Sequence, residues 1–492
     1  MNVQIVVFSF LFITSRVWAS DIVNFWSGSL LENSTVISLS SSSEADIKIE
    51  YSDKKDFSKH RFLSESVRTM EELNYYSKIT LSDLEPATKY YYRFNVNGVV
   101  NKESNMLGEF STPSRSPFSY KITLATCANT GSNNPVYDRI REEESLFYLM
   151  LGDFHYGNIY KDCDDEFLAH YNAALGSTKQ SKLYKSTPVA YMWDDHDYGP
   201  NNSSGLSPNQ DGNVACRSIA KESYRNYVPH YPLAFQGEDA VISQTFKVGR
   251  VKYILTDLRS EKRRPLFQGD CDNDIPSNCN KVKPGTNFGT KEHLDWFKQE
   301  LLDAKIKNLA VVWHSSFPYL STPDLGWFNC DDENTIKTDK GFECDDHDNW
   351  GWYPEEREDI ANFIKKNDIK DLQDPSQIKE ITESYQNIHL SLDLDVLDPK
   401  IFPLTGTPVP NGIDLLNDGN ASTAISGTKA FYISGGYSYP ILFTIDIGTS
   451  SQLDYIRYHL GDIGGSNANF YNVSVWTSPD NSTFTQQSIV MS

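Results

Sequence analysis

Five short apolar segments in the middle of the chain each run directly into polar residues of the kinds that bind metal or phosphate. Segments rich in β-branched and aromatic residues and bounded by polar ones are typical of buried strands. In open α/β sheets, ligands lie beyond the carboxyl ends of the strands. The pattern therefore predicts that these polar residues meet on one rim of one sheet. The five segments are Tyr120–Ala125, Leu146–Leu151, Val189–Trp193, Val251–Leu255 and Leu309–Trp313.

Helical periodicity occurs between and after these segments. Asn134 and Pro135 open a candidate helix that runs through Glu144, with the proline near its first turn. Two later stretches, Glu292–Ala304 and Pro354–Lys366, carry apolar residues at helical spacing. Strands that alternate with helices predict an α/β domain.

The two flanking regions show only short strand patterns. From about residue 21 to Pro113 there is no helical periodicity, and residues 84–92 resemble the corner before a late strand of a fibronectin type III-like sandwich. The tail from Asn417 reverts to short strands such as Ile441–Ile447 and Val473–Trp476. The strands expected in the N-terminal region are Val36–Leu39, Ile47–Tyr51, Tyr75–Leu81 and Tyr90–Val96.

Composition narrows the class of protein. A chain of 492 residues is too long for one ordinary core, so two or three domains are expected. Its aromatic content of 13% argues against disorder. The formal net charge of −21 argues against nucleic-acid polymers and anionic membranes as main partners. Metals and a few arginines can still reverse the sign locally, so a phosphorylated small-molecule substrate is compatible with this charge.

The N-terminus predicts export. The apolar stretch Ile5–Thr14 is followed by Val17-Trp18-Ala19, the pattern of a secretory signal cut after Ala19. The alternative is an uncleaved core strand, since no Lys or Arg precedes the apolar stretch. No later stretch is long and apolar enough to predict a transmembrane anchor, so we expect the extracellular space or an endomembrane lumen. Glycosylation sequons, each a weak motif, begin at Asn33, Asn201, Asn202, Asn420, Asn472 and Asn481.

The cysteine count is odd. Seven cysteines in an oxidising compartment leave one unpaired. The pairs Cys271–Cys279 and Cys330–Cys344 would close short loops, and Cys163–Cys216 a longer one, although sequence alone does not fix the connectivity. This assignment leaves Cys127 at the end of a buried strand, either as a metal ligand or as a structural thiol.

The residues at the strand ends suit a binuclear metal site. Two cations about 3.5–4 Å apart can activate a water and offset the charge of a phosphoryl group. Asp153 is a natural bridge, because one carboxylate can hold two cations. Asp195 and His314 suit a second metal, while Cys127 and Tyr156 can bind as anions, which suits trivalent iron.

Two further residues have roles in the expected chemistry. His196 can donate a proton or orient the phosphate. Arg259 offers a bidentate fork for phosphate. Both are therefore candidate catalytic residues.

Five motifs, taken in the order in which they occur along the chain, resemble the alkaline phosphatase D (PhoD-like) family of metallophosphatases. The resemblance covers roughly residues 21–372 and implies a phosphomonoesterase or phosphodiesterase with a binuclear site, often iron with calcium. It implies that Cys127, Asp153, Tyr156 and Asp195 are metal ligands. The motifs are Ala-Thr-Cys-Ala around Cys127, Gly-Asp-Phe-His-Tyr at 152–156, Trp-Asp-Asp-His-Asp at 193–197, Thr-Asp-Leu-Arg-Ser at 256–260 and Asp-Asn-Trp-Gly-Trp-Tyr-Pro-Glu-Glu-Arg at 348–357.

Structural interpretations compete with some of these assignments. Asp153 and Asp195 taken singly could be helix caps or turn residues, and His314 a hydrogen-bonded core histidine. His155 is interpreted as a spacer between two ligands. The pair at 263–264 is interpreted as solvated arginines, and the Asp-Asp-His-Asp string at 345–348 as part of a disulfide-tied loop.

The resemblance breaks after Ile369. The late Gly-Asp-x-His motif of such metallophosphatases is missing. The segment at 388–412 instead resembles the metal-binding segment of the arginase/agmatinase family, in which Asp393 and Asp395 would ligate manganese. The partner motifs of that family are absent, so a ureohydrolase is the third hypothesis for function. Asp393 and Asp395 either belong to an inserted strand or replace the missing ligands.

The tail resembles a discoidin (coagulation-factor type C) module, which implies a β-sandwich that contacts glycans or cell surfaces. We therefore expect a multidomain protein with an N-terminal β-sandwich, a central α/β metallophosphatase sandwich and a C-terminal β-sandwich. The first functional hypothesis is a secreted metal-dependent phosphoesterase, and the second is a weak or inactive relative that binds glycans. The expected divisions are 1–19 signal peptide, 20–115 β-sandwich, 116–372 metallophosphatase domain, 373–416 arginase-like junction and 417–492 discoidin-like domain.

Overall fold

We analysed a computed structural model of the chain. It describes residues 21–116, 118–205, 215–268, 280–316, 319 and 350–369, together with short strands at 336–338, 341–343, 431–432, 441–447, 456–460, 474–477 and 485–487. The expected signal peptide, the junction at 373–416 and the pairs Cys271–Cys279 and Cys330–Cys344 lie outside the described residues.

The central sheet carries the strand ends that the sequence singles out. Within the described residues it has eight strands, of which β10, β11 and β12 run parallel. Its order is β22 (Ile456–Leu460), β21 (Ile441–Ile447), β10 (Tyr120–Ala125), β11 (Phe147–Met150), β12 (Val189–Tyr191), β1 (Ile22–Gly28), β2 (Thr35–Ser41) and β6 (Tyr76–Leu81).

A second sheet packs against the central one, as expected for an α/β sandwich. Phe147 of β11 makes edge-to-face contacts with Phe246 and Tyr253 of the second sheet, at centroid distances of 5.6 and 5.3 Å. In the described residues this sheet has the order β13 (Gln244–Val248), β14 (Val251–Leu255) and β17 (Ala310–His314).

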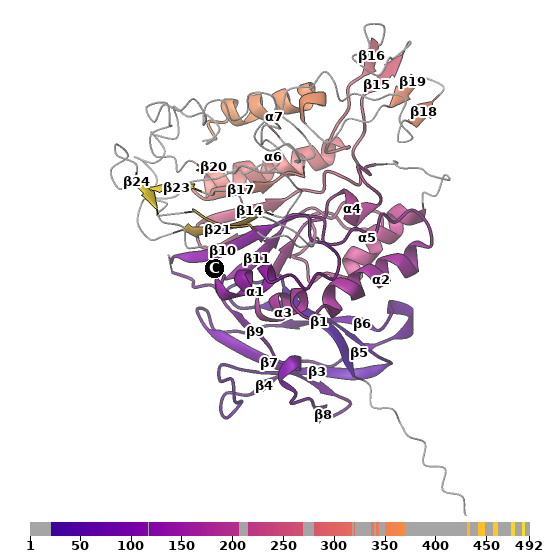
Figure 1. Cartoon of the computed structure of the whole chain (residues 1–492). Helices are drawn as coiled ribbons and strands as arrows, with labels where there is room; N and C mark the ends of the chain where they lie inside the picture. The colour runs from indigo at the N-terminus through magenta and orange to yellow at the C-terminus, as the bar shows by residue number, and fades with distance from the viewer. Residues whose placement is uncertain are drawn as a thin grey trace, which may run out of the picture.

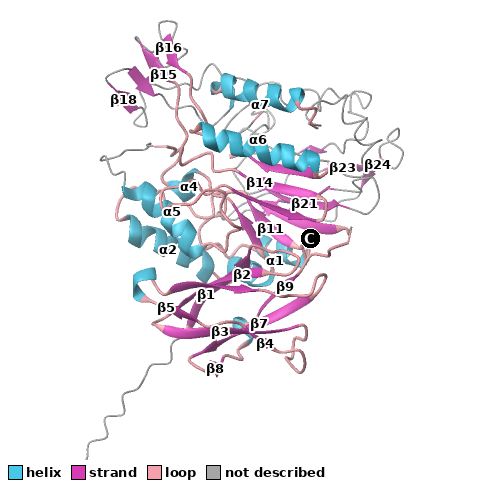
Figure 2. Ribbon diagram, turned by 180° about the vertical axis from the view of Figure 1, so that it is seen from behind, coloured by secondary structure: helices cyan, strands magenta, loops and turns pink. Residues whose placement is uncertain are grey.

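Helices cover the outer faces of both sheets, as Figures 1 and 2 show. Alternation along β14 decides which residues face which layer. Tyr253 and Leu255 belong to the core shared with the central sheet, and Ile254 points into the core under α6 and α7. The helices are α1 (Val136–Glu142), α2 (Cys163–Gly176), α3 (Gln180–Ser186), α4 (Asp195–Tyr198), α5 (Ala215–Tyr227), α6 (Lys291–Ile306) and α7 (Pro354–Lys366).

The N-terminal β-rich region is joined to the central sheet. Its strands β1, β2 and β6 extend that sheet, because β1 pairs in parallel with β12 at Gly28 and Val189. A Cβ at Gly28 would lie 2.6 Å from the Val189 carbonyl oxygen, so only glycine permits this approach. The facing sheet contains β3 (Ala45–Ser52), β4 (Phe62–Leu63), β5 (Val67–Thr69), β7 (Lys89–Val96), β8 (Val99–Val100) and β9 (Gly108–Ser111).

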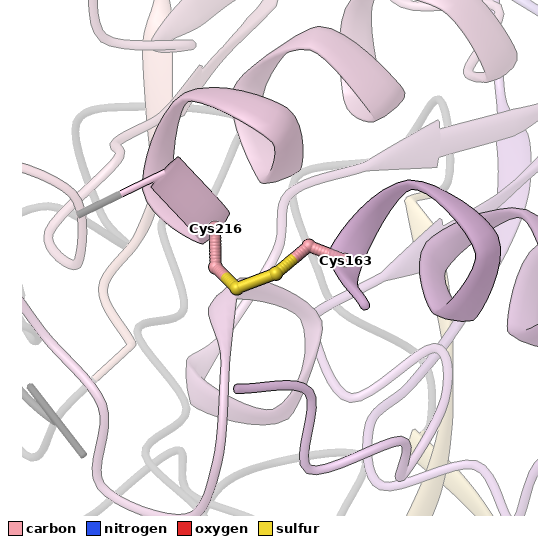
Figure 3. Close-up of a disulfide and its surroundings, with 2 residues drawn as sticks. All are labelled: Cys163 and Cys216. Atoms are coloured by element: carbon pink, nitrogen blue, oxygen red, sulfur yellow. A yellow bond between two sulfur atoms is a disulfide. The ribbon is translucent and has the colours of Figure 1, made fainter. Parts of the chain in front are cut away.

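Helix α5 is fixed at both ends. The last carbonyl groups of a helix lack partners within the helix. Here the indole of Trp26 and the hydroxyl of Ser38, both from the N-terminal region, donate to the Tyr227 carbonyl oxygen at 3.0 and 2.6 Å. At the start of α5, Cys216 forms the expected disulfide with Cys163 at the start of α2 (Figure 3).

The resemblance of the tail suggests a separate discoidin-like module, but one strand of the tail joins the central sheet. Strand β21 pairs antiparallel with β10 and so adds to the central sheet. A discoidin-like sandwich is not shown by these strands. The remaining described strands form two small sheets, one of β15 (Leu266–Gln268), β16 (Asn280–Lys283), β18 (Ile336–Thr338) and β19 (Gly341–Glu343) and one of β20 (Phe431–Tyr432), β23 (Ser474–Thr477) and β24 (Thr485–Gln487).

Among the described helices, none combines the length and apolarity that crossing a bilayer requires.

Candidate metal centre

The loops after β10 and β11 are paired through their backbones. Cys127 N donates to the Gly152 carbonyl at 3.2 Å, and Ala128 N donates to the Asp153 carbonyl at 2.8 Å. These bonds continue the β10–β11 pairing past the ends of the strands. Cys127 and Asp153 are therefore held on the same rim, as the sequence pattern predicts for residues at parallel strand ends.

This rim is conformationally strained. Cys127 and Asp153 both have a positive φ, of 58° and 54°, which costs free energy for residues with a side chain. Gly152, in the loop after β11, has a φ of 103°. A Cβ on Gly152 would lie 2.4 Å from the Cβ of Asp194, in the loop after β12. Strain of this kind is often found where a binding site dictates the backbone path.

Three buried side chains converge at the centre of the rim. Asp153, Asp195 and His196 each offer one ligand atom, and these atoms all lie within 4.8 Å of one another. The three residues are 5, 6 and 8% exposed, and within the described residues Asp153 Oδ1 accepts no hydrogen bond. Burial and the neighbouring carboxylates, Asp195 first among them, raise the pKa of Asp153 well above its ordinary value.

Tyr156 lies over this group. Its ring packs on the His196 ring at a centroid distance of 4.2 Å, and its hydroxyl interacts with Asp153 and with Cys127. Burial and these two neighbours raise the pKa of the Tyr156 phenol above its ordinary value. A cation would reverse this effect, because it favours the anionic forms of a phenol and a thiol. Among the described cysteines, Cys127 is not joined to another by a disulfide.

Asp197, the last acid of Trp-Asp-Asp-His-Asp, ties the two carboxylate loops together. Its Oδ1 accepts from the backbone N–H groups of Phe154 and His155 at 2.8 and 3.3 Å. Its Oδ2 accepts from Asp194 N at 2.9 Å and closes the capping box of α4. Both oxygens therefore hold backbone, and Asp197 positions the loops that carry Asp153 and Asp195.

Asp195 is held from the other side by the segment that follows α4. Asn202 N donates to Asp195 Oδ2, and Ser203 Oγ donates to the Asp195 carbonyl oxygen. Arg264 in turn donates to the Asn202 carbonyl oxygen at 3.0 Å and is only 4% exposed. The expectation of a solvated arginine pair is therefore wrong for Arg264, which supports the metal-site loop.

Arg259 is buried against the acids of α4. Its Nε binds Asp194 Oδ1, and one terminal nitrogen lies 3.7 Å from Asp195 Oδ1. The side chain is 2% exposed. The guanidinium thus neutralises part of the carboxylate cluster, while its catalytic role toward phosphate stays a prediction.

His314 ends β17 on the second sheet. Its Nε2 donates to the Leu151 carbonyl oxygen at 3.1 Å, which ties the second sheet to the end of β11. In the described part of the chain, Nδ1 is buried and has no hydrogen-bond partner. Burial lowers the pKa of His314 to about 4, so the neutral ring retains a lone pair on Nδ1. His314 is not in the close group around Asp153, and its role as a ligand stays a prediction.

His155 lies outside the close group of Asp153, Asp195 and His196. Its ring packs among Phe167, His170 and Tyr171, in keeping with its interpretation as a spacer. Asp393, Asp395 and the string at 345–348 lie outside the described residues.

Sequence reasoning missed the supporting residues. Asn158 accepts from His196 Nδ1 at 2.9 Å, and Asp257 accepts from Trp193 Nε1 at 2.9 Å. A signal existed for Asp257, since it lies within the Thr-Asp-Leu-Arg-Ser motif. No local pattern marks Asn158, because its partners lie in the segment after β12.

The residues on this rim fit a cation. Asp153 has a buried oxygen that accepts no hydrogen bond from the described residues, with two further carboxylates close by and a thiol–phenol pair adjoining. Cations stabilise a donor set of this kind. Asp153, Asp195, Tyr156 and Cys127 could hold metal.

Three family models match parts of the chain, and one of them covers the whole of this site. The model described as PhoD-like phosphatase matches residues 122–372, about half of the chain. The PhoD-like phosphatase N-terminal domain matches residues 21–114. The arginase family matches residues 351–428, as the resemblance of that segment indicates. No curated protein matches the chain significantly by sequence.

The chain shares its fold with a solved structure of PhoD, and other solved structures align over parts of it. A structure of PhoD aligns with a TM-score of 0.58 and 14% identity, covering 95% of this chain and 92% of that chain. Purple acid phosphatase PPD1 from yellow lupin seeds aligns with a TM-score of 0.41 and 11% identity, covering 62% and 52%. A fibronectin type III domain of the human KIAA0970 protein aligns with a TM-score of 0.16 and 19% identity, covering 20% and 77%.

Proposed function

The chain belongs to the PhoD-like phosphatase family, and from this membership we propose that it is a secreted, metal-dependent hydrolase of small phosphate esters. The observation that carries the proposal is the buried group of Asp153, Asp195 and His196, in which one Asp153 oxygen has no hydrogen-bond partner among the described residues. Such a group is costly unless a cation occupies it. Iron with calcium is the proposed pair, because a thiol and a phenol adjoin carboxylates, and manganese suits this set less well.

Each residue has a role in this chemistry. Bound cations would supply an activated water and positive charge at the phosphoryl oxygens. Asp153 adjoins both Tyr156 and Asp195, so it would be the carboxylate shared by the two cations. His196 stands beside both acids, where it can give a proton to the leaving oxygen.

The test is hydrolysis of p-nitrophenyl phosphate and bis(p-nitrophenyl) phosphate by the purified full chain, with elemental analysis of the same sample. We expect bound metal and turnover of at least one ester, and loss of both in Asp195→Asn. Asp83→Asn, in the N-terminal region, is the matched control. Metal-free protein without turnover after reconstitution would contradict the proposal and favour the non-catalytic, glycan-binding alternative.

The missing Gly-Asp-x-His motif defines a second test. If nothing replaces it, one cation should be held weakly, and activity should be low or depend on added cation. The double variant Asp393→Ala with Asp395→Ala should then match the wild type in metal content. Loss of stoichiometric metal in that variant would assign the two aspartates as ligands.

Secretion and surface contact are separate parts of the proposal. Expression of the full chain in a eukaryotic secretory host should yield medium-borne protein that begins at Ser20. N-terminal sequencing and glycosidase treatment measure cleavage and glycosylation, and a glycan array tests the tail. Retention of residues 1–19 in the purified protein would remove the argument for export.

A further inference from the structure

His196 makes one hydrogen bond that decides which of its ring nitrogens can face a substrate. Its Nδ1 lies 2.9 Å from Asn158 Oδ1. The neutral imidazole ring has one donor and one acceptor nitrogen, so the partner of Nδ1 determines the tautomer. Asn158 comes from the loop after β11, five residues beyond Asp153.

The orientation of the Asn158 amide is fixed by a second donor. Asn201 N donates to the same Oδ1 at 3.2 Å. A backbone N–H can only donate, so the atom facing it must be the carbonyl oxygen rather than the NH₂ group. The same oxygen faces His196, and therefore Nδ1 must carry a hydrogen.

The other ring nitrogen lies on the side of the metal centre. Nε2 of His196 is 3.9 Å from Asp195 Oδ2, and the Tyr156 ring packs on the imidazole face. Packing against Tyr156 therefore holds the plane of the imidazole ring, and the hydrogen bond to Asn158 determines which way the ring is turned within that plane. Asn158 has a φ of 48°, a conformation that asparagine tolerates better than most residues with a side chain.

We propose that Asn158 is a positioning residue that keeps the hydrogen on His196 Nδ1 and so presents Nε2 to the leaving oxygen of the ester. This inference rests on the proposed phosphoesterase function. During hydrolysis the water oxygen bonds to phosphorus and the ester P–O bond breaks. The donor is the protonated ring, in which both nitrogens carry hydrogen: the Nε2 proton moves to the departing oxygen, and the attacking water releases a proton to solvent. His196 is left as the neutral Nδ1–H tautomer and regains a proton on Nε2 from solvent.

Asn158→Gly tests the proposal, because glycine tolerates the left-handed backbone and removes the side-chain amide. The control is Asn308→Gly, which changes an exposed asparagine with a φ of 51° in the loop before β17. The substrates are p-nitrophenyl phosphate, whose leaving group needs no proton, and glycerol phosphate, whose leaving group does.

We expect Asn158→Gly to lower kcat for glycerol phosphate by about tenfold and for p-nitrophenyl phosphate by less than twofold. KM, metal content and thermal stability should match the Asn308→Gly control. Adding Asn158→Gly to His196→Ala should cause no further loss, because Asn158 acts through His196. Equal loss for both esters, or loss of metal, would overturn the proposal in favour of a loop-supporting role.

A readout independent of turnover is the ¹⁵N spectrum of the histidines, with His196 assigned by its absence in His196→Ala. The wild type should show the Nδ1–H tautomer, and Asn158→Gly a mixture. A neutral ring with its hydrogen on Nε2 and none on Nδ1 in the wild type would overturn the inference, whatever the activity. A wild type that hydrolyses neither ester but shows the Nδ1–H tautomer would contradict the proposed function while leaving the positioning role of Asn158 supported.

Discussion

Asp153 and Asp257 occupy equivalent places in the two sheets but have opposite surroundings. Each follows a buried strand, and they are 5 and 0% exposed. Asp153 faces other carboxylates, and one of its oxygens accepts no hydrogen bond from the part of the chain that the structure describes. Asp257 accepts from Trp193, Ile242 and Ser260.

The pKa directions follow from these surroundings. Burial by itself acts to raise the pKa of both carboxyl groups. At Asp153 the neighbouring carboxylates raise it further, whereas at Asp257 the charge of Lys221 and the hydrogen bonds from Ser260 and Trp193 outweigh burial and lower it. A strand-end position therefore brings an acid to the rim, and its partners decide whether it is available to a cation.

The largest effect should come from Asp153→Asn. We expect turnover to fall by about 10³-fold or more and bound metal to be lost. The metal-free variant should be more stable than the metal-free wild type by about 1–2 kcal/mol, because the raised pKa means that the ionised carboxylate opposes folding at neutral pH. Urea unfolding in chelator measures this, and a loss of stability would contradict the comparison.

Asp257→Asn should show the opposite pattern. The lowered pKa means that the ionised form stabilises the fold at neutral pH, and this contribution is lost as the pH falls through the folded-state pKa. We expect the free energy of unfolding to drop by about 2–3 kcal/mol, because several buried donors lose their acceptor. Metal content per folded molecule should be unchanged. Metal loss without a change in stability would place Asp257 in the metal centre.

Asp197→Asn should have an intermediate effect on metal affinity. The amide has one acceptor oxygen and turns its NH₂ group toward a backbone N–H, so one of the two loops loses its tie. We expect about 10–100-fold weaker metal binding, with the fold retained. Competition with a chromophoric chelator measures the affinity, and Asp359→Asn on α7 serves as an exposed control. Unchanged affinity would mean that the loops hold their geometry without Asp197.

The pKa of Asp257 is lowered by a nearby positive charge and by hydrogen bonds together, whereas hydrogen bonds are the main lowering influence on Glu356 of α7. Its carboxylate accepts from Asn287 N and Phe288 N, but burial dominates and raises its pKa to about 7. Its contribution to stability is therefore complete below the unfolded-state pKa and is lost as the pH rises through about 7. Glu356→Gln should flatten the pH dependence of unfolding by on the order of 1 kcal/mol. An unchanged profile between pH 5 and 8 would contradict this assignment.

The sequence predicts the strands of the rim well, because their apolar runs are short, β-rich and bounded by polar residues. It also predicts α7 to the residue and the disulfide between Cys163 and Cys216. It does not reveal β1 as the strand that joins the N-terminal region to β12, since that pairing depends on a contact between Gly28 and Val189. Nor does the sequence distinguish Asp197, whose carboxylate accepts hydrogen bonds from backbone N–H groups, from the acids that face the metal centre.

Periodicity and motif order, which are local properties, were sufficient to indicate an α/β sandwich with acids at its strand ends and membership of the PhoD-like family. The availability of each acid depended on partners distant in sequence. Asp197 accepts from Phe154, 43 residues away, and Asp257 from Trp193, 64 residues away. A carboxylate's free energy depends on the donors and charges within a few ångströms, and only the tertiary structure brings those groups together.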